Sequence, residues 1–333
     1  MSPPDPAPIH VLFVLLPDSL VLDWAGPAEV LRAANQQLQA SGQPARFVLH
    51  FVGPRPTSTS PLGLQLTGLE PLPRNLPEPA WVVVSGQPGP VTRVDSPEAQ
   101  EVLRWLRGLR LQQGALELVS ICAGAVLAAH AGLLDGRQVT THHQHLDELQ
   151  ATAPGCHVEA NRVFVEDPPV YSSAGVTTGV DLALHRVTAL CGPALAARVA
   201  QALVVPLRRG PGDAALSPFL GYRQHLHPAL HRVQDAVCAQ PQAAWTVARM
   251  AEAGHTSPRH LTRLFLAHAG IAPLQYLRRI RLATAQMALR SGLNVTQAAA
   301  QAGFSSDTQL RRAWHRFGPG GSPSADVALL QNS

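Results

Sequence analysis

The spacing of apolar residues changes near residue 206 of this 333-residue chain, and this change constrains the fold more than any other feature. Before it, uninterrupted apolar runs such as His10–Leu16 and Ala80–Ser85 alternate with segments of helical periodicity. Buried parallel strands have such runs, and helices cover both faces of the sheet that they form. After residue 206, apolar residues recur at helical spacing. We therefore predict an α/β domain followed by an all-α domain.

The first part of the chain contains several more segments of both kinds. Further strands are expected over residues 46–52, 115–120, 138–141, 162–166 and 170–173. Helices are expected over residues 27–37, 98–111, 123–131, 143–151 and 179–191. Six or more strands interleaved with helices predict a doubly wound parallel sheet sandwich.

The run PLRRGPGDAALSPFLG begins at Pro206 and is rich in proline, glycine and serine. Because this composition is typical of a linker, we assign residues 206–227 to a linker between an α/β domain at 9–205 and a helical domain at 228–318. Residues 319–333 begin with helix breakers, and we expect them to form a flexible tail.

Composition excludes several classes of protein. No run reaches the ~18 apolar residues of a membrane span, and the first residues lack the basic flank of a signal peptide. A cytoplasmic protein without a membrane partner is expected. The cysteines are widely spaced and form no CxxC pair, which indicates neither a disulfide framework nor a zinc knuckle. They are Cys122, Cys156, Cys191 and Cys238.

The net charge of +4 is distributed unevenly along the chain. Residues 1–221 carry 14 arginines and 18 acidic residues, a net charge of −4, whereas residues 222–318 carry 12 arginines and three acidic residues, a net charge of +9. A basic segment after a mildly acidic one indicates that the C-terminal part binds a polyanion. A basic face that is merely solvated remains an alternative at this point.

Two helix-turn-helix patterns follow one another in the basic segment. In the first, the short helix 247–253 ends at Gly254, and Ser257 with Pro258 provides the cap and first residue of a second helix. In the second, helix 295–302 ends at Gly303 and a helix rich in arginine follows. Both second helices have an apolar face and an opposite polar face, which is typical of helices that enter a groove.

A long helix over residues 273–291 separates the two patterns and would measure roughly 28 Å. Successive major-groove segments on one face of DNA lie ~34 Å apart, so one chain can place a helix in each. Arginine suits such helices because its side chain pairs bidentately with guanine or neutralises phosphate.

The segments SPRHLTRLF, GIAPLQYLRRIRLATAQMAL and VTQAAAQAGFSSDTQLRRAWHRFG resemble the DNA-binding domain of AraC-type transcriptional regulators. The closing proline of that family is displaced here to Pro319 or Pro323. The resemblance implies that promoter DNA is the partner, and it places the base-reading side chains in both second helices. These positions are Arg259, Thr262, Arg263, Asp307, Thr308, Arg311 and Arg312.

Cys122 lies where an apolar strand runs directly into a turn of small residues, the setting of a nucleophile elbow. A helix N-terminus there can lower the pKa of a thiol, and its backbone N–H groups can bind an anion. We therefore expect Cys122 to lie at a pocket floor and to be the most reactive cysteine. A buried cysteine that packs as a small apolar residue is the alternative.

The segments LVLDWAGPAEVLRAAN, SICAGAVLAAHAGLLDGRQVTTHH and SSAGVTTGVDLALHRV resemble the PfpI-like branch of the class I glutamine amidotransferase-like fold. The resemblance implies a ligand pocket of Asp23, Gly86, Cys122 and His142. Related hydratases use such a cysteine with such an acid, but threonine often follows the cysteine where this chain has Ala123.

His142, His143 and His145 raise the alternative of a metal site, because imidazoles at i and i+3 can share a helix face. The resemblance already accounts for His142 as a pocket residue, and we expect no metal and no cofactor. Asp181, in the segment GVDLAL, is expected to cap or orient the helix that follows it, and a pocket role is the alternative.

Together these patterns predict a transcriptional regulator, an activator rather than a repressor, and not an enzyme. The expected partners are promoter DNA, a small nitrogen-containing effector, RNA polymerase and a second copy bound through the N-terminal domain. The alternative is a cysteine-dependent hydratase or amidase that uses Cys122 as nucleophile and carries a DNA-binding appendage.

Overall fold

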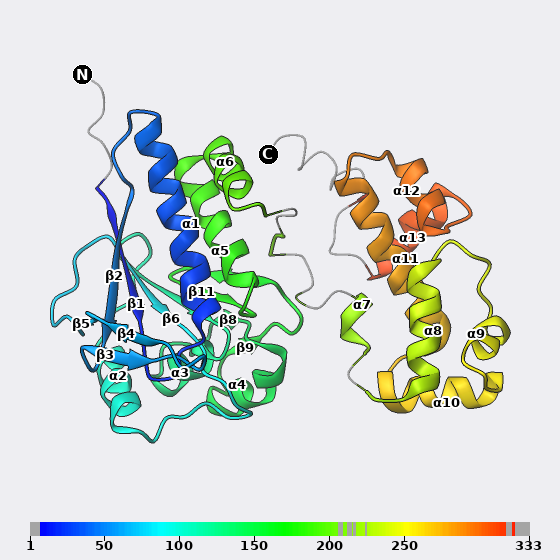
Figure 1. Cartoon of the computed structure of the whole chain (residues 1–333), viewed down its shortest axis with the longest axis horizontal. Coiled ribbons are helices and arrows are strands. Elements are labelled where there is room, and N and C mark those ends of the chain that lie inside the picture. Colours follow the sequence, from blue (N-terminus) through cyan, green and yellow to red (C-terminus); the bar gives the residue numbers. More distant parts are fainter. Residues whose placement is uncertain are drawn as a thin grey trace. The chain divides into compact units, whose positions relative to one another are not determined.

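In the computed structural model, the chain forms two compact units, Met1–Ala215 and Leu216–Ser333 (Figure 1). The structure describes residues 7–205, 209–211, 215, 218–223, 225–317 and 322–323. The expected tail therefore lies outside the described residues except for 322–323, and so does much of the expected linker. No helix in the described part of the chain is long and apolar enough to cross a membrane.

A seven-stranded sheet forms the centre of the first unit, in the order β10-β11-β7-β6-β1-β2-β5. The strands run parallel except for the antiparallel pair β10 and β11. This confirms the predicted α/β sandwich. Their bounds are β1 Ile9–Val14, β2 Phe47–Gly53, β5 Glu70–Pro71, β6 Ala80–Val84, β7 Leu116–Ile121, β10 Phe164–Asp167 and β11 Val170–Ser173.

Helices cover both faces of this sheet, as the sequence predicted (Figure 1). On one face, apolar side chains of α1, α5 and α6 share a core with the sheet, and on the other face those of α2, α3 and α4 do so. Their bounds are α1 Val21–Ala40, α2 Pro97–Arg107, α3 Gly124–His130, α4 Leu146–Thr152, α5 Thr178–Cys191 and α6 Pro193–Ala202. A 3₁₀ turn, His143–His145, precedes α4.

Helix α1 begins at Val21, earlier than the predicted start at Pro27, so Asp23 belongs to its first turn. Proline normally marks the first turn of a helix, which is why the prediction placed the start there. Close packing against α5 explains the difference: a Cβ at Gly26 would lie 2.9 Å from Val180 Cγ2, and one at Gly179 would lie 3.2 Å from Pro27 Cγ. This packing holds the turn helical on both sides of the proline.

The predicted strand 138–141 is shorter in the structure and lies outside the seven-stranded sheet. Strand β8 covers Gln138–Val139 and pairs with β9, His157–Val158, in a separate small sheet. Thr140 donates its N–H to Ser172 Oγ, and the Thr141 hydroxyl donates to the Cys122 carbonyl at 2.7 Å. These residues therefore leave the strand to hold the turn at Cys122. The remaining short pair is β3 Thr57–Thr59 with β4 Gln65–Thr67.

In the second unit, the described residues form helices and no strand, which confirms the predicted all-α domain. Two clusters of apolar side chains make its core, and α11 contributes Tyr276 and Ile280 to one and Ala285 and Leu289 to the other. The helices are α7 Pro218–Gly221, α8 Pro228–Ala239, α9 Val247–Ala253, α10 Pro258–Ala269, α11 Pro273–Arg290, α12 Val295–Ala302 and α13 Asp307–Phe317.

Candidate functional site

Three loops meet at the carboxyl edge of the parallel sheet. The order of strands reverses around β1, because the chain first adds β2 on one side and later β6 on the other. In open α/β sheets, a crevice forms at such a reversal and serves as the binding site. Asp23 follows β1, Gly86 follows β6 and Cys122 follows β7, so the topology brings the three together.

The turn at Cys122 has the backbone of a nucleophile elbow, as predicted. Its φ of 58° lies in the left-handed region, and its N–H donates to the Ser173 carbonyl at 3.0 Å. A Cβ at Gly124 would lie 2.1 Å from the Val84 carbonyl oxygen, so only glycine fits at the start of α3. The turn is fixed by the strands on either side of it.

Asp23 is fully buried and binds both neighbouring loops. One carboxylate oxygen accepts the Val176 N–H at 2.7 Å, and the other accepts the Gly86 N–H at 3.2 Å. The Cys122 thiol also donates to this carboxylate. Sequence analysis predicted Asp23, Gly86 and Cys122 at one site, and the structure brings them together.

Two glycines allow the loops to approach this closely. A Cβ at Gly86 would lie 3.1 Å from Asp23 Oδ2, and one at Gly175, where φ is +88°, would lie 2.4 Å from Cys122 Cβ. Sequence analysis missed Gly175 and Val176. Both belong to the segment SSAGVTTG, which resembles the PfpI-like branch and therefore contained the signal.

Burial dominates the electrostatics of this site. It raises the pKa of the Asp23 carboxyl, against the opposite effect of the Val176 and Gly86 N–H groups. It also raises the pKa of the Cys122 thiol, and the Asp23 charge raises it further. The expectation of a thiol pKa lowered by the helix N-terminus is therefore wrong, because desolvation outweighs the one backbone hydrogen bond from Ala123.

His142 is connected to this group through its neighbour Thr141, whose hydroxyl binds the Cys122 carbonyl. Partial burial, with the nearby His143 and His145, lowers the pKa of His142 to about 4, so its imidazole is neutral at pH 7. His145 Nδ1 lies 2.6 Å from Glu148 Oε2. No group of three or more histidine, cysteine or acidic side chains in the described residues has an arrangement that would hold a metal.

Buried polar atoms without hydrogen-bond partners lie next to the site residues in the sequence. Within the described residues, they include Trp24 Nε1, Ser85 Oγ and Ser173 Oγ. Trp24 follows Asp23, Ser85 precedes Gly86, and the Ser173 carbonyl accepts the Cys122 N–H. A buried polar group that lacks a partner costs stability, so these atoms suit a site that takes up polar molecules.

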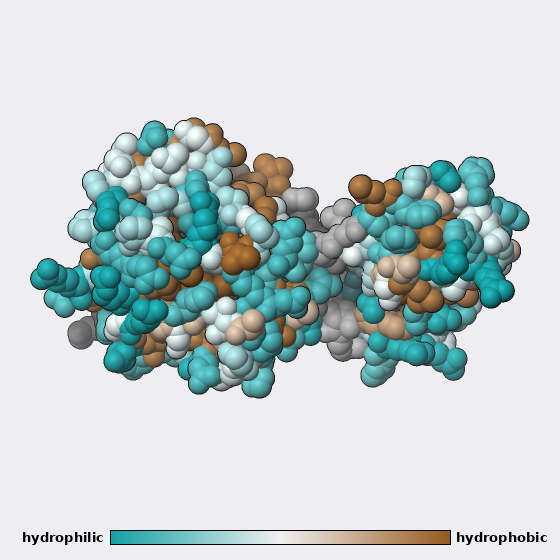
Figure 2. Space-filling view, turned by 90° about the horizontal axis from the view of Figure 1, so that it is seen from below, coloured by the Kyte–Doolittle hydropathy of each residue, from teal (hydrophilic) through white to brown (hydrophobic). Residues whose placement is uncertain are grey.

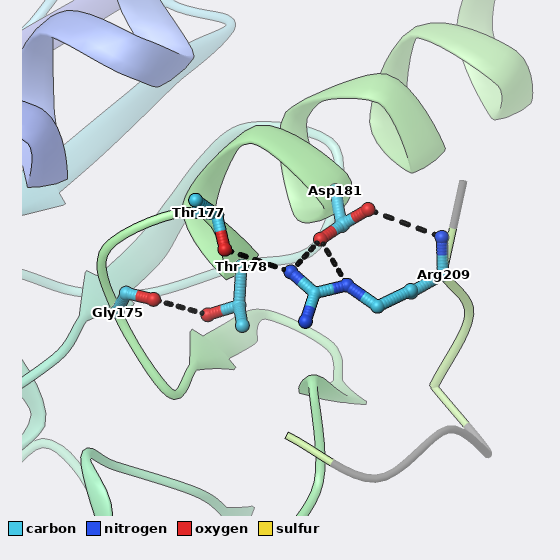
Figure 3. A network of polar contacts seen from close by, with 5 residues as sticks. All are labelled: Gly175, Thr177, Thr178, Asp181 and Arg209. Carbon is cyan, nitrogen blue, oxygen red and sulfur yellow. Dashed lines mark hydrogen bonds and ion pairs between the residues drawn. The ribbon is translucent and has the colours of Figure 1, made fainter. Parts of the chain in front are cut away.

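Asp181 lies inside the first turn of α5 and binds Arg209, a partner that sequence analysis did not predict (Figure 3). Its Oδ2 atom accepts from the Arg209 side chain at 2.9 and 2.6 Å, and Oδ1 accepts from the Arg209 backbone N–H at 3.1 Å. The same guanidinium donates to the Thr177 hydroxyl at 2.9 Å. Asp181 therefore joins α5 to the segment that follows α6.

In the second unit, α10 presents the first set of predicted DNA-binding side chains to solvent. Arg259, Thr262 and Arg263 line a shallow hollow on its outer face, together with Leu266 and Ala267. The buried Leu261, Leu264 and Phe265 hold the opposite face against the core. The Ser257 side chain caps the helix by accepting the His260 N–H, as the sequence suggested.

Helix α13 presents the second set in the same way. Its outer hollow is lined by Thr308, Arg311, Arg312, His315 and Arg316. The inner face carries the buried Leu310 and Trp314.

Asp307, at the start of α13, accepts a hydrogen bond at 2.9 Å from the Thr296 hydroxyl of α12. His315 and Arg316 line the same hollow one further turn along the helix, and neither is among the base-reading positions that the sequence predicts.

Comparison with known proteins assigns both units. Residues 250–324 match the Helix-turn-helix domain family, and residues 79–189 match the DJ-1/PfpI family. The chain is 30% identical to the HTH-type transcriptional regulator CdhR of Pseudomonas aeruginosa, over 96% of this chain and 91% of that protein. The chain belongs to the AraC-type transcriptional regulators with a DJ-1/PfpI domain.

Other proteins are similar to most of the chain or to part of it. The HTH-type transcriptional regulator GlxA of Rhizobium meliloti is 29% identical over 92% of this chain and 91% of its own length. The isonitrile hydratase of Pseudomonas putida is 29% identical over 55% of this chain and 73% of its own length. A THiJ/PfpI family protein of Pseudomonas syringae shares the fold, with a TM-score of 0.50 and 21% identity over 74% of this chain and 89% of that one.

The relatives that span nearly the whole chain are regulators, so this AraC-type protein is a DNA-binding transcriptional regulator. They agree with the expectation that it is not an enzyme, whereas the hydratase corresponds to about half of the chain.

The burial of Cys122 leads us to expect a different order of cysteine reactivity from the one that the sequence suggests. Burial raises the pKa of all three thiols, but Cys122 is only 4% exposed, whereas Cys191 and Cys238 are half-buried. Because the thiolate is the reactive form, iodoacetamide at pH 8 should label Cys191 and Cys238 before Cys122, as followed by mass spectrometry. Asp23→Asn removes a neighbouring charge, so it should shift the pH dependence of Cys122 labelling to lower pH.

The Glu29→Gln variant serves as the control, because Glu29 is an exposed residue of the same helix, paired with Arg32. It should leave all four labelling rates unchanged. Cys122 labelling first in the wild-type protein would contradict the burial argument.

Proposed function

We propose that the first unit senses a small polar metabolite that contains nitrogen, and that its binding controls transcription activated from promoter DNA held by the second unit. The observation that carries the proposal is the fully buried Asp23 carboxylate at the reversal point of the sheet. A buried carboxylate in this position is a selective group for a ligand, because a cation or an N–H donor offsets the cost of its burial.

The surroundings of Asp23 support a ligand that donates hydrogen bonds or carries positive charge. Among the described residues, the groups that influence the pKa of Asp23 are two backbone N–H groups and one thiol, and burial still raises that pKa. An ammonium or amide group of a ligand would bring it down again. Among the described residues, the Ser85 and Ser173 hydroxyls are buried without a partner, and we infer that they bind polar atoms of the same molecule.

His142, which follows Thr141 in the chain, suits the same kind of ligand. With a pKa of about 4, its imidazole stays neutral through the physiological range and does not repel a cation. We also propose that the protein is cytoplasmic, pairs with a second copy through the first unit, and contacts RNA polymerase as an activator.

The isonitrile hydratase relative favours one further candidate, an enzyme in which Cys122 attacks a carbon–nitrogen substrate. Three observations weaken it: the thiol is buried, its pKa is raised, and Ala123 follows it where related hydratases often have threonine. A nucleophilic cysteine needs an accessible thiolate.

A thermal-shift screen with amines, amino acids and betaines tests the sensor proposal. A selective ligand at about 100 times its Kd should stabilise the wild-type protein by about 2.7 kcal/mol. We expect Asp23→Ala to lose this shift, because no neighbouring carboxylate replaces it, and Cys122→Ser to keep most of it.

The hydratase alternative predicts a different result: the wild-type protein would consume the ligand, and Cys122→Ser would abolish that turnover. An equal ligand-induced thermal shift in Asp23→Ala and in the wild-type protein would show that the ligand does not bind Asp23.

We also propose that α10 and α13 read bases in successive major-groove segments. The 18-residue α11 between them is roughly 27 Å long, close to the ~34 Å between such segments. Arg259, Thr262 and Arg263 are assigned to the first segment, and Thr308, Arg311 and Arg312 to the second. Asp307 is assigned to the second segment as well, in a position set by Thr296.

Replacement of one arginine on each helix tests this assignment. The wild-type protein would first select a DNA site from a random library. Arg263→Ala and Arg312→Ala should each weaken binding to that site by about 1–3 kcal/mol, through a lost bidentate base contact. Arg198→Ala is the control, because it removes the same charge from an exposed position of the first unit. An equal loss on random DNA would make Arg263 and Arg312 phosphate contacts instead.

A further inference from the structure

The loop Gly175–Thr177 is held against the candidate site by its backbone. Gly175 packs on Cys122, and the Val176 N–H donates to Asp23. Val176 has a φ of 55°, in the left-handed region that a β-branched residue rarely adopts. The residue is 41% exposed, so burial of its side chain does not explain the conformation. The hydrogen bond to Asp23 is thus a contact that holds the strained residue in place.

The other side of this loop binds Arg209. The Thr177 hydroxyl accepts a hydrogen bond from the Arg209 guanidinium, which also donates to Asp181 (Figure 3). Within the same loop, the Thr178 hydroxyl donates to the Gly175 carbonyl at 2.8 Å. Arg209 therefore contacts the residue that directly follows Val176. A change at Val176 reaches Arg209 through one peptide unit.

Arg209 lies in the segment between α6, which ends at Ala202, and Leu216, where the second unit begins. Its partner Asp181 is nearly buried, with a side chain that is 5% exposed. Loss of a cation from a buried carboxylate is costly, so the contact with Asp181 holds Arg209 itself against the first unit. The segment in turn leads to the DNA-binding unit.

We propose that the loop Gly175–Thr177 and the Asp181–Arg209 pair transmit the state of the Asp23 site to the segment that leads to the second unit. The proposal rests on the proposed ligand site at Asp23. A ligand that binds the Asp23 carboxylate displaces the Val176 N–H from it. Val176 then leaves its strained conformation, Thr177 moves with it, and the contact with Arg209 weakens.

Thermodynamic coupling of this kind is reciprocal, which makes the proposal testable without a ligand. Loss of the Arg209 contacts with Asp181 and Thr177 must weaken the hydrogen bond from Val176 to Asp23. Loss of that hydrogen bond must in turn weaken the contacts of Arg209. A rigid loop without coupling would confine each effect to the substituted residue and its direct contacts.

Hydrogen exchange followed by mass spectrometry on the full-length protein measures both directions. Arg209→Ala should speed exchange in the peptide that contains Val176, and Asp23→Asn should speed exchange in the peptide that contains Arg209, each by about fivefold or more. Arg209→Lys keeps the charge but not the forked hydrogen bonds, and should give an intermediate effect. Glu29→Gln removes an exposed acid of α1 that pairs with Arg32, and should change neither peptide.

The peptide that contains α3 is the control for general loosening of the first unit. A variant counts in the test when its α3 peptide exchanges at the wild-type rate. The proposal is overturned if Asp23→Asn leaves the Arg209 peptide at the wild-type rate while the Val176 peptide opens, or if Arg209→Ala leaves the Val176 peptide unchanged. Loss of the ligand-induced thermal shift would be a separate failure, because it concerns the site and not the coupling.

Discussion

The first unit depends on the hydrogen bonds that the buried Asp23 carboxylate accepts from two loops. The Val176 and Gly86 N–H groups reach it from different strand ends, and the Cys122 thiol reaches it from a third. Parallel strands place their carboxyl ends at one edge, but only glycine at positions 86 and 175 lets the backbones come this close. One carboxylate thus links the three loops at this edge, adds to the effect of burial on the pKa of the thiol, and holds the Val176 backbone.

The second unit depends on a different constraint, a helix shared between two small cores. Neither core is large, and α11 gives apolar side chains to both. This arrangement fixes the separation of α10 and α13 by the length of a single helix, while the polar faces of both helices stay exposed. In Figure 2, hydrophilic residues cover much of the visible surface, with only scattered brown patches of hydrophobic residues.

Much of this could be predicted from the sequence, for identifiable physical reasons. Continuous apolar runs predicted the central strands, and small residues around Cys122 predicted the elbow. Capping residues such as Ser257 predicted the helices that carry the DNA-binding side chains. The start of α1 and the Asp181–Arg209 pair could not be predicted, because both depend on contacts between segments far apart in the chain. The raised thiol pKa was missed because local position suggests the helix dipole, whereas burial is a property of the whole fold.

A crystal structure of the protein with the effector from the thermal-shift screen tests the central claim most directly. We expect a nitrogen atom of the effector within about 3 Å of an Asp23 carboxylate oxygen, at hydrogen-bond distance. We also expect that the Val176 N–H no longer binds that carboxylate. An effector bound elsewhere, with the Asp23 hydrogen bonds to Val176 and Gly86 as in the present structure, would contradict the claim.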